Sequence, residues 1–506
     1  MRVLLKLFKF LCLFVVVLIF LSSNWLLTNY GNIKVDELLF YIFVPIKTAE
    51  RGLINSFITK SLIPSLMISS ILFVVLYCLV KEIKKHNFFE ICIRIRSKIL
   101  SFNIKKVTVL FLFRLVEVAI ALSVVYISMN KLHVFEYIKE QRMSSPFIKD
   151  NYIDPRKSNI IFPDKKKNLI YIYTESLEST YFSKEYGGAM SDNLLEPITD
   201  LVKNNIYFSS TENFGGGALT LAATSYTSAA LVAHTAGLPL KINGNEINSS
   251  YGHKSFLKGA YTLGEILEKE NYNQMLMIGS DKQFGNRDVY FETHGNYEIY
   301  DLNTAKEKNK IPKDYHVWWG FEDGKLFEYA KEEITKLSKK EEPFNFTLLT
   351  ANTHHVGGYT EESCEQKFND NYANAIYCSA GQLNEFISWI KKQDFYNDTV
   401  IIIVGDHLSM DPNFFKEIDS NYQRTVFNLF INSSITTENT NNRVFTTMDM
   451  FPTTLASMGV KIDGDKLGLG TNLFSDKQTI TEEYGFDYVN SEISKNSLFY
   501  NTEFVY

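Results

Sequence analysis

Carboxylate and imidazole side chains follow closely after three separate apolar runs of this chain. The side chains are Glu175, His354, His355, Asp406 and His407. Carboxylate oxygens and imidazole nitrogens together suit a divalent ion such as zinc or manganese. A single histidine at the end of a strand is more often an ordinary loop residue. Carboxylate or imidazole side chains at the ends of three strands in one domain favour a metal site.

A hydroxyl nucleophile for chemistry at that metal is offered by GGGALTLAATSYTSAALVAHTAGLPL (215–240). Small and hydroxyl residues lead into a helix-like stretch that ends at Gly237. Thr227 stands at the predicted helix start, where its ordinary role is that of an N-cap. Its functional role would be that of a nucleophile whose alkoxide is favoured by a metal and by the helix dipole. Thr224 competes for the same role.

The elements that must position these groups alternate between strands and helices. Five apolar runs read as buried strands, at 168–173, 273–279, 345–352, 399–405 and 425–431. Three amphipathic stretches read as helices, at 262–271, 324–340 and 382–393. This alternation predicts a mostly parallel sheet that helices cover on both faces. Functional groups of such sheets gather beyond the carboxyl ends of the strands, which is where the candidate residues fall.

The first 130 residues have a different character from the rest. Three apolar runs are long enough to cross a bilayer, at 8–27, 62–80 and 107–128. No cleavage site of small residues follows the first run, so we expect an uncleaved anchor rather than a signal peptide. Arg114 and Glu117 are three apart in the third run and can face each other on a helix. Residues 35–58, between the first two runs, are broken by charges and Pro45 and suggest an interfacial segment on the outer side.

Basic residues set the predicted orientation. Segment 81–106 carries eight Lys or Arg residues against two Glu residues, which favours the cytoplasmic side. The third crossing then places the chain beyond about residue 130 outside the cytoplasm. Residues 131–164, rather irregular to about 160, are expected to form a linker at the membrane surface, before an outer domain at 165–506. The chain of 506 residues has a net charge of −5, which gives no reason to expect a nucleic-acid partner.

These motifs together resemble the sulfatase and alkaline-phosphatase-like superfamily, in particular its membrane-anchored phosphoglycerol transferases. The family includes enzymes that decorate periplasmic glucans and the lipoteichoic acid synthases. YIYTESLESTYF (171–182) is similar to the family's first metal-ligand strand, and IIIVGDHLSM (401–410) to its Asp-His metal pair. The resemblance implies an alkaline-phosphatase-like α/β/α sandwich outside the membrane, preceded by about three transmembrane helices.

The resemblance also implies roles for individual residues. It places Glu175, Thr227, Asp406 and His407 on a divalent metal, manganese or zinc or else magnesium. Thr227 is preferred to Thr224 as the nucleophile because it lies ten residues before Gly237, the spacing seen in sulfatases. FGNRDVYFETHGNYEIYD (284–301) points to Arg287 as a phosphate ligand.

TANTHHVGG (350–358) resembles the segment with the family's substrate-phosphate histidine. Here Val356 and Gly357 stand where the family usually has a proline, so His354 and His355 are not separated. Several stretches, including VWWGFEDGKLFEYA (317–330), look more like the glucan-modifying branch. The same branch suggests that Cys364 and Cys378 can bridge, which in an oxidising compartment would contribute roughly 3 kcal/mol.

The function implied is transfer of glycerol phosphate from phosphatidylglycerol to an extracytoplasmic glycan, through a phospho-Thr intermediate and with release of diacylglycerol. The implied location is the bacterial inner membrane, with the catalytic domain in the periplasm. Three alternatives stay open. A phosphoethanolamine transferase would usually have more cysteines in this domain, and a sulfatase would have a Cys/Ser-x-Pro-x-Arg motif where Thr227 is followed by SAA. A noncatalytic membrane scaffold would not need to keep all four metal-site residues.

Overall fold

The structure is a computed structural model that describes residues 1–31, 33–43, 51–96, 98–242, 256–315 and 317–505. The chain divides into two compact units. The first comprises Met1–Ile33 and Glu50–Glu136, and the second Lys34–Ala49 and Tyr137–Tyr506.

The first unit contains the predicted membrane helices. Three helical stretches are long and apolar enough to cross a bilayer, at Val3–Tyr30, Gly52–Lys85 and Lys106–Lys131. They are built from α1 (Arg2–Tyr30), α3 (Arg51–Phe57) with α4 (Ile63–Lys85), and α5 (Lys106–Lys131). Arg114 and Glu117 form an ion pair on α5, as their spacing predicted.

The basic segment 81–106 is not an irregular loop. Most of it forms an antiparallel hairpin of β1 (Phe88–Ile95) and β2 (Lys98–Lys105). Residues 131–160 were expected to be rather irregular, and this was wrong, since they contain α6 (Val134–Arg142) and α7 (Phe147–Asn151). Helix α7 buries Phe147 and Ile148 in the core of the second unit, which supplies the apolar burial that a solvated linker lacks.

The second unit is organised around a six-stranded sheet. Its strands are β4 (Asn168–Thr174), β5 (Asn273–Ile278), β6 (Glu298–Tyr300), β7 (Phe344–Leu349), β8 (Thr399–Gly405) and β9 (Asn428–Ile431). Their order is β6-β5-β7-β4-β8-β9, and only the edge strand β9 runs antiparallel to its neighbour. The predicted mostly parallel sheet is confirmed, and β6 is a short edge strand that the sequence did not indicate.

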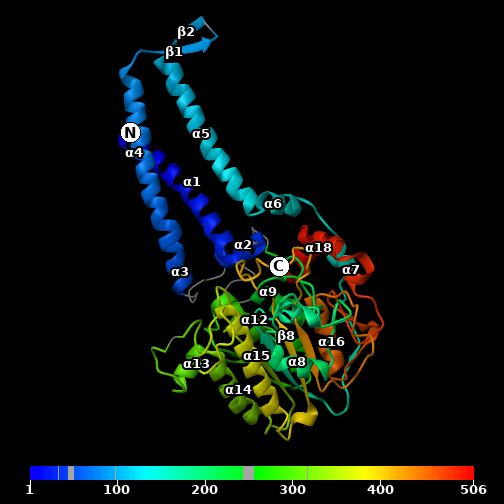
Figure 1. Cartoon of the computed structure of the whole chain (residues 1–506). Coiled ribbons are helices and arrows are strands. Elements are labelled where there is room, and N and C mark those ends of the chain that lie inside the picture. Colours follow the sequence, from blue (N-terminus) through cyan, green and yellow to red (C-terminus); the bar gives the residue numbers. More distant parts are fainter. Residues whose placement is uncertain (32, 44–50, 97, 243–255, 316, 506) are drawn as a thin grey trace. The chain divides into compact units, whose positions relative to one another are not determined.

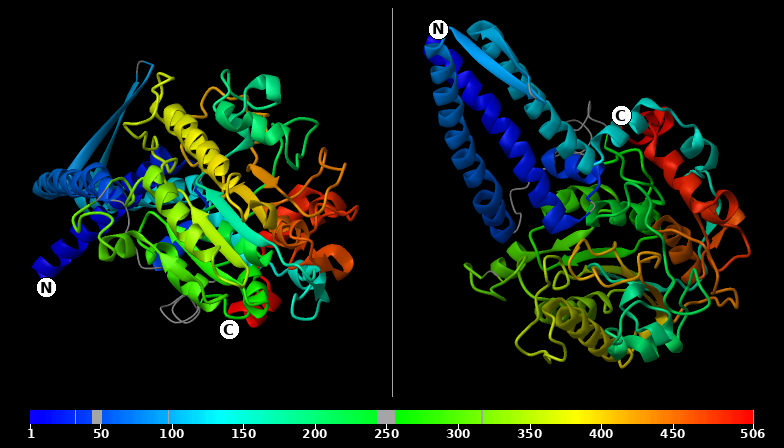
Figure 2. Two further views of the ribbon diagram at one scale, coloured as in Figure 1. Left: turned by 90° about the horizontal axis from the view of Figure 1, so that it is seen from below. Right: turned by 45° about the horizontal axis from the view of Figure 1, so that its top comes forward.

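Alternate residues of the central strands enter two separate cores. Tyr171 and Ile402 belong to a core that includes α9 (Thr227–Ala236), α11 (Leu263–Lys269), α12 (Arg287–Thr293) and α16 (Met450–Ser457). Ile172 and Ile403 belong to the other core, with α8 (Glu196–Lys203), α14 (Asp323–Leu337) and α15 (Asn371–Ile390). Figures 1 and 2 show α14 and α15 side by side along this second face. Helices therefore cover both faces, giving an α/β/α sandwich.

Helix α15 is much longer than its predicted segment, 382–393. It begins at Asn371, where the side chain of Asp370 accepts a hydrogen bond from the Ala373 amide at 2.9 Å. Gly381 interrupts the amphipathic pattern in the sequence, yet the helix continues through it. A Cβ built on Gly381 would meet nothing within 4 Å.

Short elements complete the second unit. They are α2 (Val35–Phe43), α13 (Leu302–Glu307), α17 (Ile480–Tyr484), α18 (Phe486–Ser494), α19 (Leu498–Tyr500), and the strand pairs β3 (Ile160–Ile161) with β10 (Lys461–Ile462) and β11 (Lys466–Leu467) with β12 (Gly470–Thr471). Helix α2 comes from the stretch expected to be an interfacial segment. It belongs to the compact second unit, where Phe40 is fully buried, while residues 44–50 of the stretch lie outside the described residues and its place at the membrane interface stays a prediction.

Two glycines offer a matched test of this packing. A Cβ on Gly405, the last residue of β8, would lie 1.9 Å from the carbonyl oxygen of Leu177, whereas Gly381 faces open space. We expect Gly405→Ala to lower the free energy of unfolding by about 1–3 kcal/mol, because backbone must move to admit the methyl group. Gly381→Ala should raise it by about 0.5–1 kcal/mol. Thermal unfolding of the full chain in detergent measures both, and equal stabilities would contradict the packing described at the end of β8.

Candidate active site

The carboxyl ends of β4 and β8 bring the first candidate residues together. In the parallel register Thr174 lies opposite Gly405, so Glu175 and Asp406 follow at the same level of the sheet. The Glu175 amide donates to Thr350 Oγ1 at 2.9 Å, and Ser176 Oγ donates to the Glu175 carboxylate at 2.7 Å. The first bond connects the end of β4 to the residue that follows β7, and the second holds the Glu175 carboxylate.

Asp406 is held by the backbone on one side only. Its Oδ1 accepts hydrogen bonds from the amides of Ser176, at 2.8 Å, and His407, at 2.9 Å. Its Oδ2 is buried and has no hydrogen-bond partner among the described residues. One carboxylate oxygen is therefore fixed while the other is available to a ligand.

His407 points one ring nitrogen into the same space. Its Nδ1 lies 2.9 Å from the carbonyl oxygen of Leu408, which can only accept, so Nδ1 carries the proton of that bond. Its Nε2 lies 3.3 Å from Asp406 Oδ2 and 3.6 Å from Glu175 Oε1. A hydrogen bond from the far nitrogen to a carbonyl is the usual support of a metal-binding histidine.

Glu175, Asp406 and His407 meet the requirements of a metal site. One ligand atom from each lies within 4.8 Å of the others, and all three side chains are buried. Two buried carboxylates are costly unless a cation compensates their charge. The free Oδ2 of Asp406 and Nε2 of His407 both face this point, so the residues present fit a divalent ion.

The pKa values of the cluster show the same need for positive charge. Burial, with the charge of Glu175, raises the pKa of Asp406 to about 6. Burial alone would lower the pKa of His407, but the carboxylates of Asp406 and Glu175 outweigh it and raise that pKa to about 9. Without an ion, a proton on His407 is the available compensation, and a divalent ion would take its place.

Thr227 is the hydroxyl at this cluster. It is the first residue of α9, and its Oγ1 lies 3.3 Å from His407 Nε2. Its side chain makes no capping hydrogen bond, since the N-cap residue of α9 is Tyr226. Gly237 ends the helix in a left-handed conformation with φ of 62°, as its predicted role requires.

Thr224 has a different environment. Its Oγ1 accepts a hydrogen bond from the Leu221 amide at 2.9 Å and donates to the Leu221 carbonyl at 3.0 Å. The side chain is fully buried and closes a local turn. This geometry favours Thr227 over Thr224 as the reactive hydroxyl.

Arg287 lies at the start of α12 and is 7% exposed. Its guanidinium donates to the carbonyl oxygens of Phe284 and Asp281 and to Ser280 Oγ, each at 2.9 Å. Burial lowers its pKa, and the charge of Glu175 is among the influences that oppose this. The three bonds fix the guanidinium in place near the carboxylate cluster.

His354 and His355 follow β7 and stack on each other, with ring centroids 4.7 Å apart. His354 also packs against Trp319, at 4.5 Å between centroids, and burial lowers its pKa to about 4. His355 is 3% exposed, and burial lowers its pKa as well. Both rings are therefore neutral at neutral pH, and the charge of His407 acts on both.

The loop that carries the histidines is braced by residues that sequence reasoning missed. Asp323, the first residue of α14, accepts hydrogen bonds from the amides of Ala351 and Asn352 at 2.8 and 3.0 Å. Glu361 accepts from Asn352 Nδ2 at 2.7 Å and from the Gly324 amide at 2.8 Å. A carboxylate directly after the WWGFE stretch was the available signal for Asp323.

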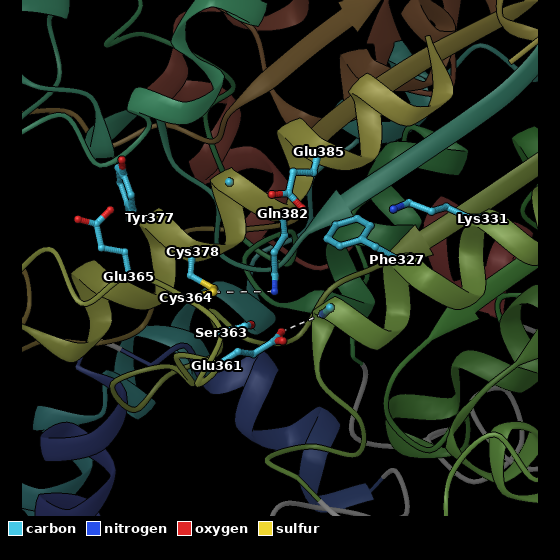
Figure 3. Close-up of a pocket in the computed structure, with 12 residues that line it drawn as sticks. Phe327, Lys331, Glu361, Ser363, Cys364, Glu365, Tyr377, Cys378, Gln382 and Glu385 are labelled. Carbon is cyan, nitrogen blue, oxygen red and sulfur yellow. Dashed lines mark hydrogen bonds between the residues drawn. A yellow bond between two sulfur atoms is a disulfide. The ribbon is translucent and has the colours of Figure 1, made fainter. Parts of the chain in front are cut away.

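The predicted disulfide between Cys364 and Cys378 is present. It ties the segment after Glu361 to α15 at the side of a hollow of about 410 Å³, shown in Figure 3. Glu361 lines that hollow and also contacts the histidine loop through Asn352. The bridge thus anchors the segment that holds this loop.

Removing one carboxylate of the cluster should empty the metal site. We expect Asp406→Ala to weaken divalent-metal binding by more than the roughly 10–100-fold that loss of an outer-shell partner causes. Asp476→Ala, which removes an exposed carboxylate, is the matched control and should leave the metal content unchanged. Elemental analysis of the purified full chains measures both. Equal metal content in the two variants would show that this cluster is not the metal site.

Comparison with known proteins identifies the family of this chain. Residues 167–460, more than half of the chain, match the model of the Sulfatase family. Phosphoglycerol transferase I of Escherichia coli (strain 55989 / EAEC) is 32% identical over 325 residues, and so is that of Shigella boydii serotype 18. Each match covers 63% of this chain but only 40% of the relative, so the chain spans less than half the length of these relatives.

Two solved structures share the fold. A protein in the alkaline phosphatase superfamily from Vibrio parahaemolyticus has a TM-score of 0.50 and 22% identity, over 65% of this chain and 76% of that one. The integral membrane protein lipooligosaccharide phosphoethanolamine transferase A from Neisseria meningitidis has a TM-score of 0.51 and 13% identity, over 90% and 84%. They confirm the predicted alkaline-phosphatase-like domain after a helical membrane region. The chain is a membrane protein that belongs to the sulfatase family.

Proposed function

We propose that this protein transfers a phosphoglycerol headgroup from phosphatidylglycerol to an extracytoplasmic glycan through a covalent intermediate on Thr227. The observation that carries the proposal is the position of Thr227 Oγ1, 3.3 Å from Nε2 of His407 in the Glu175–Asp406–His407 cluster. The similarity to phosphoglycerol transferase I supports the choice of headgroup.

The cluster would hold a divalent metal through Glu175, Asp406 and His407, with Thr227 as fourth ligand. When bound, the ion lowers the pKa of the Thr227 hydroxyl and neutralises charge on the phosphoryl oxygens. Two carboxylates, one imidazole and one hydroxyl suit manganese or zinc, and also admit magnesium.

In the first half of the reaction Thr227 Oγ1 loses its proton and attacks phosphorus. The bond from phosphorus to the diacylglycerol oxygen breaks, that oxygen takes up a proton, and diacylglycerol leaves. The start of α9 favours the developing alkoxide, because Thr227 is the first residue of the helix and the N-terminal end of a helix dipole is positive. In the second half a glycan hydroxyl loses its proton and attacks phosphorus, the bond from phosphorus to Thr227 Oγ1 breaks, and Oγ1 takes up a proton to restore the Thr227 hydroxyl.

Arg287 and the two histidines would handle the phosphoryl group. The guanidinium of Arg287, fixed by its bonds to Phe284, Asp281 and Ser280, would bind a phosphoryl oxygen. His354 and His355 are neutral, and each keeps one ring N–H, so either could donate a hydrogen bond to phosphate.

The membrane helices would keep the catalytic unit near a lipid donor, whose diacylglycerol product returns to the bilayer. The basic segment 81–106 supports a cytoplasmic hairpin and a catalytic unit on the periplasmic side of the inner membrane.

Replacement of the nucleophile tests the covalent mechanism. We expect Thr227→Ala to reduce release of diacylglycerol from labelled phosphatidylglycerol by at least ~10³-fold. Its metal content should stay largely unchanged, because Glu175, Asp406 and His407 remain. Thr224→Ala is the matched control and should keep activity, since its hydroxyl serves only the turn at Leu221. Peptide mass mapping of trapped wild-type protein should find the phosphoryl group on Thr227. Activity in Thr227→Ala with loss in Thr224→Ala would move the nucleophile to Thr224.

Reporter fusions test the orientation. A reporter fused after residue 95 should be active only in the cytoplasm, because the flanking segment is strongly basic, and one fused after residue 150 only outside. Alkaline phosphatase and a fluorescent protein, which work on opposite sides of the membrane, give the two readouts. Exchanged activities would place the catalytic unit in the cytoplasm and remove access to an extracytoplasmic glycan.

A further inference from the structure

Helix α2 is an unexpected part of the catalytic unit. Residues Val35–Phe43 come between the first two membrane spans in the sequence, yet they pack in the core of the second unit. Phe40 is fully buried, with its ring centroid 5.3 Å from that of Tyr226 and 6.4 Å from that of Phe256. Tyr226 directly precedes Thr227, so α2 contacts the start of the nucleophile helix.

The same helix also contacts the segment that holds Arg287. Tyr41 stacks on Phe284 with ring centroids 5.7 Å apart and an interplanar angle of 26°. Phe284 accepts a hydrogen bond from Arg287 Nε at 2.9 Å through its carbonyl oxygen. Helix α2 therefore contacts residues next to the nucleophile and next to the phosphate-binding arginine.

Glu37 lies one helical turn before Tyr41, on the same side of α2. It is 3% exposed, and its carboxyl group forms no hydrogen bond or ion pair with the residues that the structure describes. Burial raises the pKa of Glu37 to about 8, and the nearby charge of His407 opposes that rise. Glu37 is not a member of the three-residue metal cluster, and its place beside the site follows from the packing of α2 on Tyr226 and Phe284.

Burial of a carboxyl group is costly, and a hydrogen bond from a ligand would offset part of that cost. We propose that Glu37 is a substrate-binding residue, whose carboxyl group accepts a hydrogen bond from an alcohol hydroxyl of the substrate. This inference rests on the proposed function, in which both the donor headgroup and the glycan acceptor carry such hydroxyls.

The charges around the site favour one orientation of the bound substrate. Phosphate is drawn to Arg287 and to the metal position, and a carboxyl group disfavours it, so the phosphate end would not face Glu37. A hydroxyl donor is complementary to a carboxyl acceptor in either protonation state of that group. The alcohol end of the substrate would then lie against α2, with the phosphoryl group at Thr227.

The test compares Glu37→Gln with Glu298→Gln, which removes an exposed carboxylate from the edge strand β6. Each full chain in detergent micelles is given phosphatidylglycerol or phosphatidylpropanol, whose headgroup lacks the glycerol hydroxyls, and release of diacylglycerol is measured. If Glu37 binds the donor headgroup, the preference for phosphatidylglycerol in kcat/KM should fall by about 10-fold in Glu37→Gln, mainly through KM. Glu298→Gln should keep the wild-type preference.

A second arm separates the acceptor from the donor. If Glu37 binds the acceptor hydroxyl, the lipid preference stays unchanged. The share of headgroup transferred to a glucose oligosaccharide rather than to water should then be smaller in Glu37→Gln than in the wild type. Wild-type behaviour of Glu37→Gln in both arms overturns the inference while leaving the proposed function intact. Loss of metal from Glu37→Gln also overturns it, because Glu37 would then serve the metal. If Glu37→Gln does not fold, Glu37→Asp replaces it, with the same defect expected in weaker form. No diacylglycerol release by the wild type from any lipid would refute the proposed function itself.

Discussion

The candidate site depends above all on the parallel pairing of β4 with β8. Thr174 opposite Gly405 places two acidic residues, Glu175 and Asp406, at the same edge of the sheet, and both are buried. A one-residue shift of this register would turn the side chains of β8 to the opposite core and separate the two carboxylates. Gly405 permits the pairing because the Leu177 carbonyl occupies the space where a side chain would start.

Burial of these carboxylates is costly, and the surrounding residues offset only part of that cost. Backbone amides and Ser176 satisfy some of the oxygens, while Asp406 Oδ2 stays open toward His407. The fold therefore provides a preorganised cluster of negative charge, which is what a divalent ion and a phosphoryl-transfer centre require. Asp323 and Glu361 extend the same arrangement outward, since each fixes part of the loop before His354.

Helix α2 connects the membrane part of the sequence to this chemistry. Its aromatic residues pack beside Tyr226 and Phe284, which adjoin the candidate nucleophile Thr227 and the candidate phosphate ligand Arg287. A lipid substrate is confined to the bilayer. An enzyme that acts on its headgroup therefore benefits when part of the site comes from a segment that is joined directly to membrane spans. The second unit thus includes a segment from between the first two membrane spans as well as the C-terminal part of the chain.

The sequence by itself determined the elements whose signal is local. Local patterns indicate the buried strands, the three membrane spans and the Asp-His, His-His and Glu motifs. A strand buried on both faces is a continuous apolar run, and the polar residues that follow it mark its end. The start of α15 and the short strand β6 were missed, since a glycine and short length weaken periodicity.

Only the tertiary structure decided which of these residues meet. Thr227 and Thr224 are three residues apart and chemically alike, yet one hydroxyl faces His407 and the other closes a turn at Leu221. Glu37 carries no motif, and the places of Asp323 and Glu37 follow from the packing of α14 and α2. Such contacts join residues far apart in the chain, so they depend on how the sheet and helices assemble, which no local pattern encodes.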